Sequence, residues 1–121
     1  MTLLNGLLLK PDDSQLWDVE LRQDNGSNLN SLYHHLDCRA VDVIRLTDSI
    51  DLWVDDEAML VSEPQVNTVL TNITIAFGHY FQPIHGAGLF LSGNDKTGAT
   101  ETLTPEQVSI IRNAHKQALL M

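Results

Sequence analysis

Two basic side chains stand one helical turn apart near the end of this sequence, in a segment without a side-chain carboxylate. Arg112 and Lys116 lie within residues 107–121, whereas the whole chain has 16 acidic against 7 basic residues and a formal net charge of −9. Residues four apart on a helix are neighbours, and cations there can hold phosphate groups by charge-assisted hydrogen bonds. We therefore expect an anionic ligand beside this helix. The alternative is that both cations only offset the helix dipole.

A polar loop bounded by glycines precedes this helix. Residues 92–98 read Ser-Gly-Asn-Asp-Lys-Thr-Gly, and loops of this kind present backbone N–H groups to anions. Thr104, Pro105 and Gln107 then form a helix start, with Thr104 as the N-cap and Gln107 completing a capping box. We expect the ligand to lie between this loop and the helix that begins at Pro105.

The rest of the chain predicts a single α+β domain, residues 1–121, that positions these groups. Hydrophobic periodicity and turn signals predict strands over 3–10, 16–22, 40–46, 50–55 and 84–91. Apolar residues at helical spacing predict helices over 29–36 and 67–77, in addition to the C-terminal helix at the ligand site. We expect a mainly antiparallel sheet of about five strands with two or three helices. The hairpin of 40–46 and 50–55 is expected to form its middle.

Composition and charge exclude several classes of protein. Hydrophobic residues make up 43% of the chain, as in ordinary folded domains, and no apolar run is long enough to cross a bilayer. The excess of acid argues against binding to duplex nucleic acid through its phosphates. The single Cys38 suits a reducing compartment, and the N-terminus lacks the basic region of a signal peptide. We therefore expect a cytoplasmic protein.

The sequence holds no recognised catalytic motif and no recognised metal motif. Two groups of potential ligands lack the spacing of calcium or structural zinc sites: Asp51, Asp55, Asp56 and Glu57, and His34, His35 and Cys38. Cys38 and a histidine four residues away could form a nucleophile and its base, but this spacing alone is weak evidence. We expect a binding protein with no cofactor and no metal, and not an enzyme.

Several segments, taken in order, resemble a family of phage proteins. They are Leu-x-x-Leu-Tyr at 29–33, Val-Asp-Val-Ile at 41–44, Asp-Leu-Trp-Val-Asp-Asp-Glu at 51–57 and Gly-Ala-Gly-Leu-Phe-Leu at 86–91. This order resembles small phage-encoded domains long catalogued as of unknown function and, among them, the first type of anti-Thoeris sponge. The resemblance implies a viral homo-oligomer, dimer or hexamer, that binds the cyclic ADP-ribose signal of a bacterial TIR enzyme in the host cytoplasm. Some members also bind cyclic oligonucleotides at separate sites.

The resemblance also implies four ligand-binding residues. The family's pocket uses an aromatic ring that stacks on the base, an asparagine in a polar loop and two basic residues on the last helix. The matching positions in this sequence are Phe81, Asn94, Arg112 and Lys116, and Tyr80 is the alternative aromatic. The second basic position resembles an arginine in the family. Lysine lacks the planar fork that grips phosphate with two bonds, so we expect an effect on affinity or ligand choice.

A second hypothesis, from a different functional class, rests on residues 42–63. This segment holds seven acidic residues and one basic residue, Arg45. Such a surface could belong to an acidic antagonist of another protein, for example a DNA mimic that inhibits a host defence nuclease. Seven carboxylates are few for imitating a duplex, so this hypothesis ranks second. A phosphodiesterase that degrades the same signals ranks third.

Overall fold

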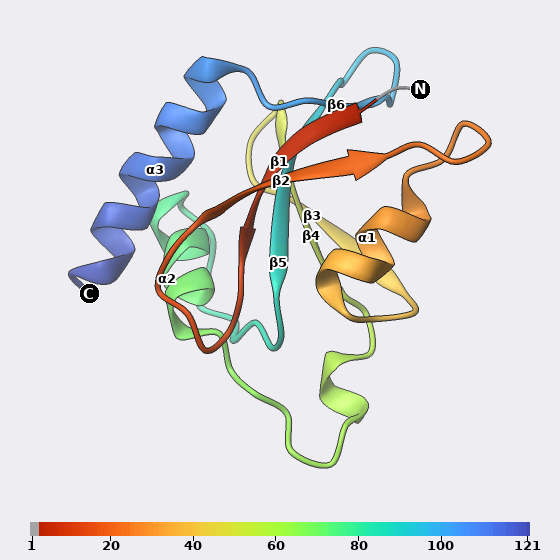
Figure 1. The fold of residues 1–121 in the computed structure, drawn as a ribbon. Coiled ribbons are helices and arrows are strands. Elements are labelled where there is room, and N and C mark those ends of the chain that lie inside the picture. The colour runs from red at the N-terminus through yellow and green to blue at the C-terminus, as the bar shows by residue number, and fades with distance from the viewer. Residues whose placement is uncertain (1–2) are drawn as a thin grey trace.

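The sequence folds into a sheet with helices on both faces, as a computed structural model of residues 3–121 shows (Figure 1). The strands are β1 (Leu3–Leu9), β2 (Trp17–Arg22), β3 (Val41–Arg45), β4 (Ile50–Asp55), β5 (Gly88–Gly93) and β6 (Thr100–Glu101). The helices are α1 (Leu29–Leu36), the short 3-10 helix η1 (Ala58–Leu60), α2 (Thr68–Ala76) and α3 (Pro105–Leu119). The predicted α+β class, with its mainly antiparallel sheet and C-terminal helix, is confirmed.

The strand order is β2-β1-β5-β4-β3, with β6 paired to the end of β5, and every pairing is antiparallel. β5 is therefore the central strand, and the expectation that the hairpin of 40–46 and 50–55 forms the middle of the sheet was wrong. β3 lies at an edge. The burial of the two strands agrees with these positions. Every residue of β5 is buried, on both faces of the sheet, whereas β3 leaves Asp42, Val43 and Arg45 exposed.

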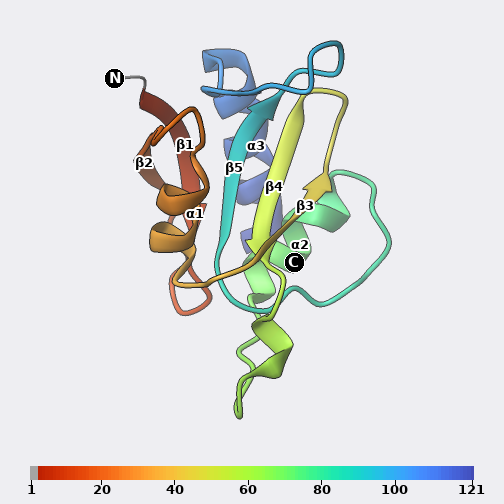
Figure 2. The same ribbon diagram turned by 90° about the vertical axis from the view of Figure 1, so that its right-hand side faces the viewer.

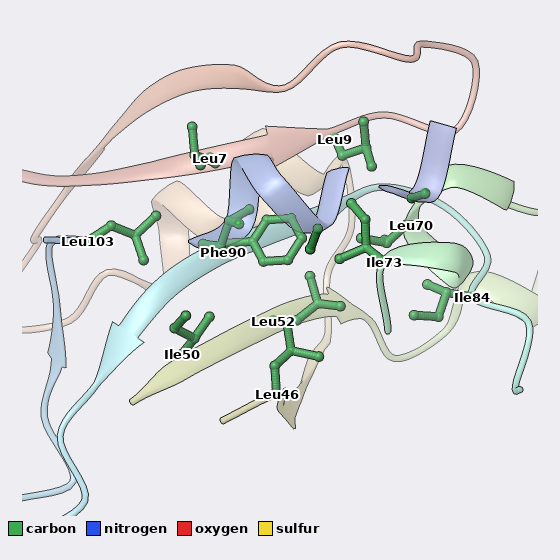
Figure 3. Packing of buried hydrophobic residues seen from close by; sticks show 13 residues of the cluster. Leu7, Leu9, Leu46, Ile50, Leu52, Leu70, Ile73, Ile84, Phe90 and Leu103 are labelled. Carbon is green, nitrogen blue, oxygen red and sulfur yellow. The ribbon is translucent and has the colours of Figure 1, made fainter. Parts of the chain in front are cut away.

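The larger hydrophobic core lies on the face of the sheet that α2 and α3 cover. Figure 3 shows the ring of Phe90 from β5 among side chains from β1, β4 and α2. The fully buried members of this core, each with 0–1% exposure, are Leu7, Leu9, Ile50, Leu52, Leu70, Ile73, Phe90 and Ile111. This core fixes α3, the helix that carries the predicted cations, against the sheet.

A smaller core lies on the opposite face, beneath α1. Leu32 and Leu36 of α1 pack with residues of β1, β2 and β5, namely Leu4, Leu8, Leu21, Leu89 and Leu91. Figure 2 shows α1 at the β1–β2 side of the sheet, so it covers only part of this face. The part over β3 carries no helix, and Val43 there is 43% exposed.

The helix boundaries follow the expected local signals. Asn67 caps α2 by accepting the Leu70 N–H at 3.1 Å, and the chain leaves the helix at Gly78, whose φ of 91° favours glycine. Thr104 and Gln107 form the predicted capping box at the start of α3. Within residues 3–121, no helix combines the length and apolar content that a membrane span requires.

The expected strand over 84–91 begins only at Gly88. Upstream, Gly86 adopts a φ of 79°, and a single bridge joins His85 to Val66. This left-handed residue interrupts the extended backbone, so residues 79–87 form a loop along the β3 side of the sheet. Residues 79–85 of this loop are called the aromatic loop below, because they include Tyr80 and Phe81.

Candidate functional site

The first turn of α3 is anchored to the sheet through a buried amide. Gln107 is 7% exposed, and its Nε2 donates to the Ser49 carbonyl at 2.9 Å and to Ser92 Oγ at 3.1 Å. Its Oε1 accepts the Thr104 N–H at 2.9 Å. Gln107 therefore completes the capping box and also ties α3 to the ends of β4 and β5. These contacts set the direction in which α3 runs.

The two predicted cations lie on the outer side of α3. Ile111, Ala114 and Ala118 are buried on the inner side, which leaves Arg112 and Lys116 exposed. Leu119, the last residue of α3, is 47% exposed. Arg112 and Lys116 therefore lie outside the buried side of the helix.

Arg112 faces β2 across a loose ion pair. Its Nη2 lies 3.6 Å from Asp18 Oδ1, and the two side chains are 44% and 85% exposed. This distance exceeds that of a hydrogen bond, and exposed pairs of this kind contribute little to stability. Lys116 forms no ion pair with any residue between 3 and 121. Both cations are therefore free to bind an anion.

The turn between β1 and β2 supports the same part of α3. His115 Nε2 donates to the Ser14 carbonyl at 2.6 Å. Asp13 fixes this turn by accepting the Gln15 N–H at 3.0 Å and the Trp17 Nε1–H at 2.7 Å. These hydrogen bonds to the ionised carboxylate lower the pKa of Asp13. The turn is thus joined to α3 through His115.

Asn94 begins the polar loop after β5, and its side chain is used within that loop. Its Oδ1 accepts the N–H groups of Lys96 at 2.9 Å and Thr97 at 3.2 Å, and its Nδ2 donates to Glu101 Oε1 at 3.2 Å. The Gly98 N–H donates to the Asn94 carbonyl. The expectation that this loop offers free N–H groups to an anion was wrong for Lys96, Thr97 and Gly98, because the turn at Asn94 binds their N–H groups.

A charged clamp holds the polar loop against the sheet. Arg45 of β3 pairs with Asp51 on β4, at 3.2 Å between Nε and Oδ1, and also with Asp95 of the loop. Asp51 is 6% exposed, so Arg45 neutralises a nearly buried carboxylate. Gly93 lets the strand pass this pair, since a Cβ there would overlap the Asp51 carboxylate. Sequence reasoning missed this clamp, although Arg45 and Asp51 directly oppose each other in the hairpin register.

Tyr80 and Phe81 lie on the aromatic loop, at the β3 side of the sheet. Their exposures are 96% and 70%, and His79 Nε2 anchors the loop by donating to the Leu46 carbonyl at 3.2 Å. A groove of about 460 Å³ runs between this loop, β3, β4 and η1. Tyr80 lines this groove, and Phe81 does not. If an aromatic ring stacks on a ligand in the groove of the same chain, that ring is Tyr80.

The groove, called the acidic groove below, was not foreseen from the sequence. Its rim holds Asp42, Asp55 and Asp56, and its apolar floor includes Val54 and Ile84. Residues far apart in the chain meet here, so periodicity carried no signal for it. The dense acidic group at 51–57 supplies only part of the rim.

One chain does not bring the four predicted ligand-binding residues together. Arg112 lies beside β2, whereas the aromatic loop that carries Phe81 flanks β3, and these strands form opposite edges of the sheet. Asn94 follows the central strand β5 and is tied toward β3 through the clamp on Asp95. Figure 2 shows α3 behind the sheet and the loop after α2 extending beyond β3. A pocket that uses all four residues therefore needs more than one copy of the chain.

The histidines and Cys38 do not gather into a group of metal ligands in the part of the chain that the structure describes. No three His, Cys, Asp or Glu side chains among residues 3–121 are placed to hold a metal ion. His35 Nε2 donates to the Glu20 carbonyl at 3.0 Å. Burial and then the nearby Asp55 carboxylate raise the pKa of the Cys38 thiol. This thiol is therefore less nucleophilic than an ordinary cysteine.

The comparisons with known proteins identify the family of the chain but no individual relative. No curated protein and no solved structure matches the chain. A family model described as a domain of unknown function, DUF3846, matches residues 4–116, which include most of β1 and most of α3. The chain belongs to this DUF3846 family.

Proposed function

We propose that this protein binds and sequesters a cyclic ADP-ribose-type immune signal in the host bacterial cytoplasm and does not cleave it. The observation that carries the proposal is the exposed pair Arg112 and Lys116 on α3, in a chain with a net charge of −9. Only the loose contact with Asp18 occupies Arg112 among the described residues. A pyrophosphate can bridge two cations one helical turn apart. The resemblance to anti-Thoeris sponges supports the ligand class, which extends to cyclic oligonucleotides in some members.

The aromatic part of the proposed pocket comes from a second copy of the chain. Arg112 and the aromatic loop lie at opposite edges of one sheet, so a homo-oligomer, dimer or hexamer, is the arrangement that joins them. Each cation contributes about 1.5–3 kcal/mol through charged hydrogen bonds, and a stacked ring of Phe81 or Tyr80 adds about 1–3 kcal/mol. Asn94 acts by holding the shape of the polar loop, since its side-chain oxygen and nitrogen are engaged there.

Isothermal titration with cyclic ADP-ribose isomers tests this proposal. We expect Arg112→Ala to weaken binding about ten-fold or more, which corresponds to about 1.4 kcal/mol. Arg22→Ala is the matched control, because Arg22 is an exposed arginine on β2 outside the proposed site. Recovery of intact ligand after heating the complex separates a sponge from a phosphodiesterase. Absence of binding by the wild type excludes this ligand class.

A second candidate function, an acidic antagonist of another protein, is favoured by the β3 side of the molecule. Met59, Leu60 and Val61 are 57–76% exposed beside the carboxylates of the acidic groove. Exposed apolar residues with an acidic rim are typical of protein-binding surfaces. Capture of a host DNA-binding protein that survives Arg112→Ala but not Asp56→Lys would favour this candidate over the sponge.

A further inference from the structure

The acidic groove combines two kinds of surface. Asp42, Asp55 and Asp56 supply carboxylates at its rim, and Val54 and Ile84 supply apolar area at its floor. Asp42 and Asp55 each accept a neighbouring backbone N–H at 2.8 Å, from the residues at 43 and 57 respectively. Asp56 is exposed, and its carboxylate accepts no hydrogen bond from residues 3–121. Asp56 is therefore the rim carboxylate most available to a partner.

The carboxylates of the acidic groove have no basic side chain beside them in the groove lining of the described residues. Among residues 3–121, no lysine or arginine lines it. His79 and His85 also line it, and His79 is engaged with the Leu46 carbonyl. A partner that covers these carboxylates must bring its own positive charge, since buried unpaired carboxylates are unfavourable. It must also bring apolar side chains to cover the floor.

The end of α3 has both properties. Leu119, Leu120 and Met121 are 47%, 89% and 63% exposed, and Lys116 is exposed one turn earlier. Residues 107–121 carry no acidic side chain. These four residues, called the α3 tip below, form an apolar surface with one cation on a chain that is otherwise strongly acidic.

We propose that the α3 tip of one copy of this chain docks into the acidic groove of a second copy. Lys116 then faces the rim carboxylates, and Leu120 and Met121 cover the apolar floor. This pairing follows the usual arrangement of an interface, with apolar anchors inside and complementary charges around them. The inference rests on the proposed function only for the expectation of a homo-oligomer, and it names the two surfaces that meet. In the docked pair Lys116 serves the contact between the copies, which leaves Arg112 as the cation for the ligand.

The positions of tip and groove suit a two-fold dimer. Both adjoin α2: Asn72 Nδ2 donates to the Ala118 carbonyl at 3.3 Å beside the tip, and Thr74 lines the groove. No residue of α3 lines the groove of its own chain in the described part. Two copies related by a two-fold axis can therefore exchange tips and make two equal contacts.

Two single substitutions and their mixture test the docking. Leu120→Asp places a carboxylate on the tip, and Asp56→Lys places a cation on the groove rim. We expect light scattering after gel filtration to give the wild type twice the 13.5 kDa of one chain. Each variant alone should have the mass of one chain. An equimolar mixture should regain the dimer mass. In the mixed dimer, the unchanged tip of one variant meets the unchanged groove of the other. At the second contact, the introduced carboxylate of the tip meets the introduced cation of the groove rim.

Matched substitutions elsewhere serve as controls for the two interface variants. Leu29→Asp alters an exposed leucine at the start of α1, which is 44% exposed. Asp24→Lys reverses an exposed charge in the turn before α1. Both should retain the wild-type mass. Recovery of dimer in the mixture also shows that the two interface variants are folded.

The outcomes separate this inference from the proposed function. A wild type with the mass of one chain at about 100 µM, or a dimer that neither variant disrupts, overturns the docking. A protein captured by the groove while the mass of the variants stays unchanged also overturns it, in favour of a different occupant. A dimer that binds no cyclic ADP-ribose supports the docking and removes the proposed function. A stable monomer that binds cyclic ADP-ribose overturns the docking and supports the proposed function.

Discussion

The two edge strands of the sheet, β2 and β3, differ in how their outward backbone groups are hydrogen-bonded. At the β2 edge, α1 satisfies backbone groups that point away from β1: Ser31 Oγ accepts the Arg22 N–H at 2.8 Å, and His35 Nε2 donates to the Glu20 carbonyl at 3.0 Å. At the β3 edge, the Val43 N–H is bonded only to the adjacent Asp42 carboxylate among the described residues. The fold itself covers one edge and leaves the other open.

Charge follows the same division. Arg112 flanks the β2 side through its contact with Asp18, whereas the carboxylates of the acidic groove line the β3 side. An open edge with acidic side chains resists pairing with arbitrary strands and still accepts a partner of complementary charge. We propose that α3, beside β2, is the platform for the ligand and that the open β3 side is the surface for another molecule.

The largest expected effect tests whether the platform is fixed. Gln107→Ala removes three hydrogen bonds of a side chain that is 7% exposed. We expect it to lower the free energy of unfolding by about 3 kcal/mol, because buried partners lose their hydrogen bonds. Urea unfolding followed by circular dichroism measures this change. Val43→Thr, on the open side and outside the acidic groove, should change stability by less than about 0.5 kcal/mol. A similar loss in both variants would contradict the division into a fixed and an open side.

The next effect concerns the clamp on the polar loop. Arg45→Ala should cost about 2 kcal/mol, because Asp51 is 6% exposed and would lose its cation; this value is reduced from that of a fully buried pair, since Arg45 is 46% exposed. Arg39→Ala is the matched control, since its pair with Glu57 is mostly exposed and contributes little to stability. Thermal unfolding compares the two.

A second substitution identifies the cause of the loss at the clamp. Adding Asp51→Asn to Arg45→Ala should restore part of the stability, because the amide carries no charge that needs a partner. If Arg45→Ala and Arg39→Ala cost the same, the buried carboxylate is not the source of the effect.

A smaller effect tests how α1 closes the β2 edge. Ser31→Ala removes the acceptor for the Arg22 N–H and should cost about 1 kcal/mol. Hydrogen exchange of the Arg22 amide should accelerate, while that of the Leu91 amide in central β5 should change no more than global stability does. Unchanged protection of Arg22 would mean that the edge is not closed by this side chain.

The smallest effect concerns the thiol near the acidic side. Burial and then Asp55 raise the pKa of Cys38, so less thiolate exists at a given pH and alkylation slows. Iodoacetamide at a pH of about 8, close to the ordinary pKa of a thiol, should react with Cys38 more slowly than with a free cysteine peptide. Asp55→Asn should modestly accelerate the reaction. A rate above that of the peptide would indicate an activated nucleophile and would restore an enzymatic interpretation.

Local sequence signals were sufficient to predict α3, but they did not predict the order of the strands in the sheet. The capping box of Thr104 and Gln107 is decided within four residues, so the start of α3 was readable from the sequence. The pairing of Leu7 with Phe90 joins residues far apart in the chain, and hydrophobic periodicity does not encode it. The central position of β5 therefore emerged only from the structure.

The candidate site shows the same limit. That Arg112 and Lys116 lie on one helix, four residues apart, followed from the helix signals in the sequence, and the helix is present. That Asn94 would accept the N–H groups of Lys96 and Thr97 was missed, although an asparagine followed by short polar residues and glycine is typical of such turns. The separation of Phe81 from Arg112 depends on which strands form the edges, so sequence spacing could not reveal it.

Sequestration of an uncleaved signal can be measured by mass spectrometry of the small molecules that heat releases from the purified protein. The protein is first co-expressed with a TIR enzyme that makes the cyclic ADP-ribose signal. We predict that intact cyclic nucleotide leaves the wild type and Arg22→Ala, and that Arg112→Ala releases little. Release of no nucleotide by the wild type, or only of a cleaved product, would contradict the proposed function.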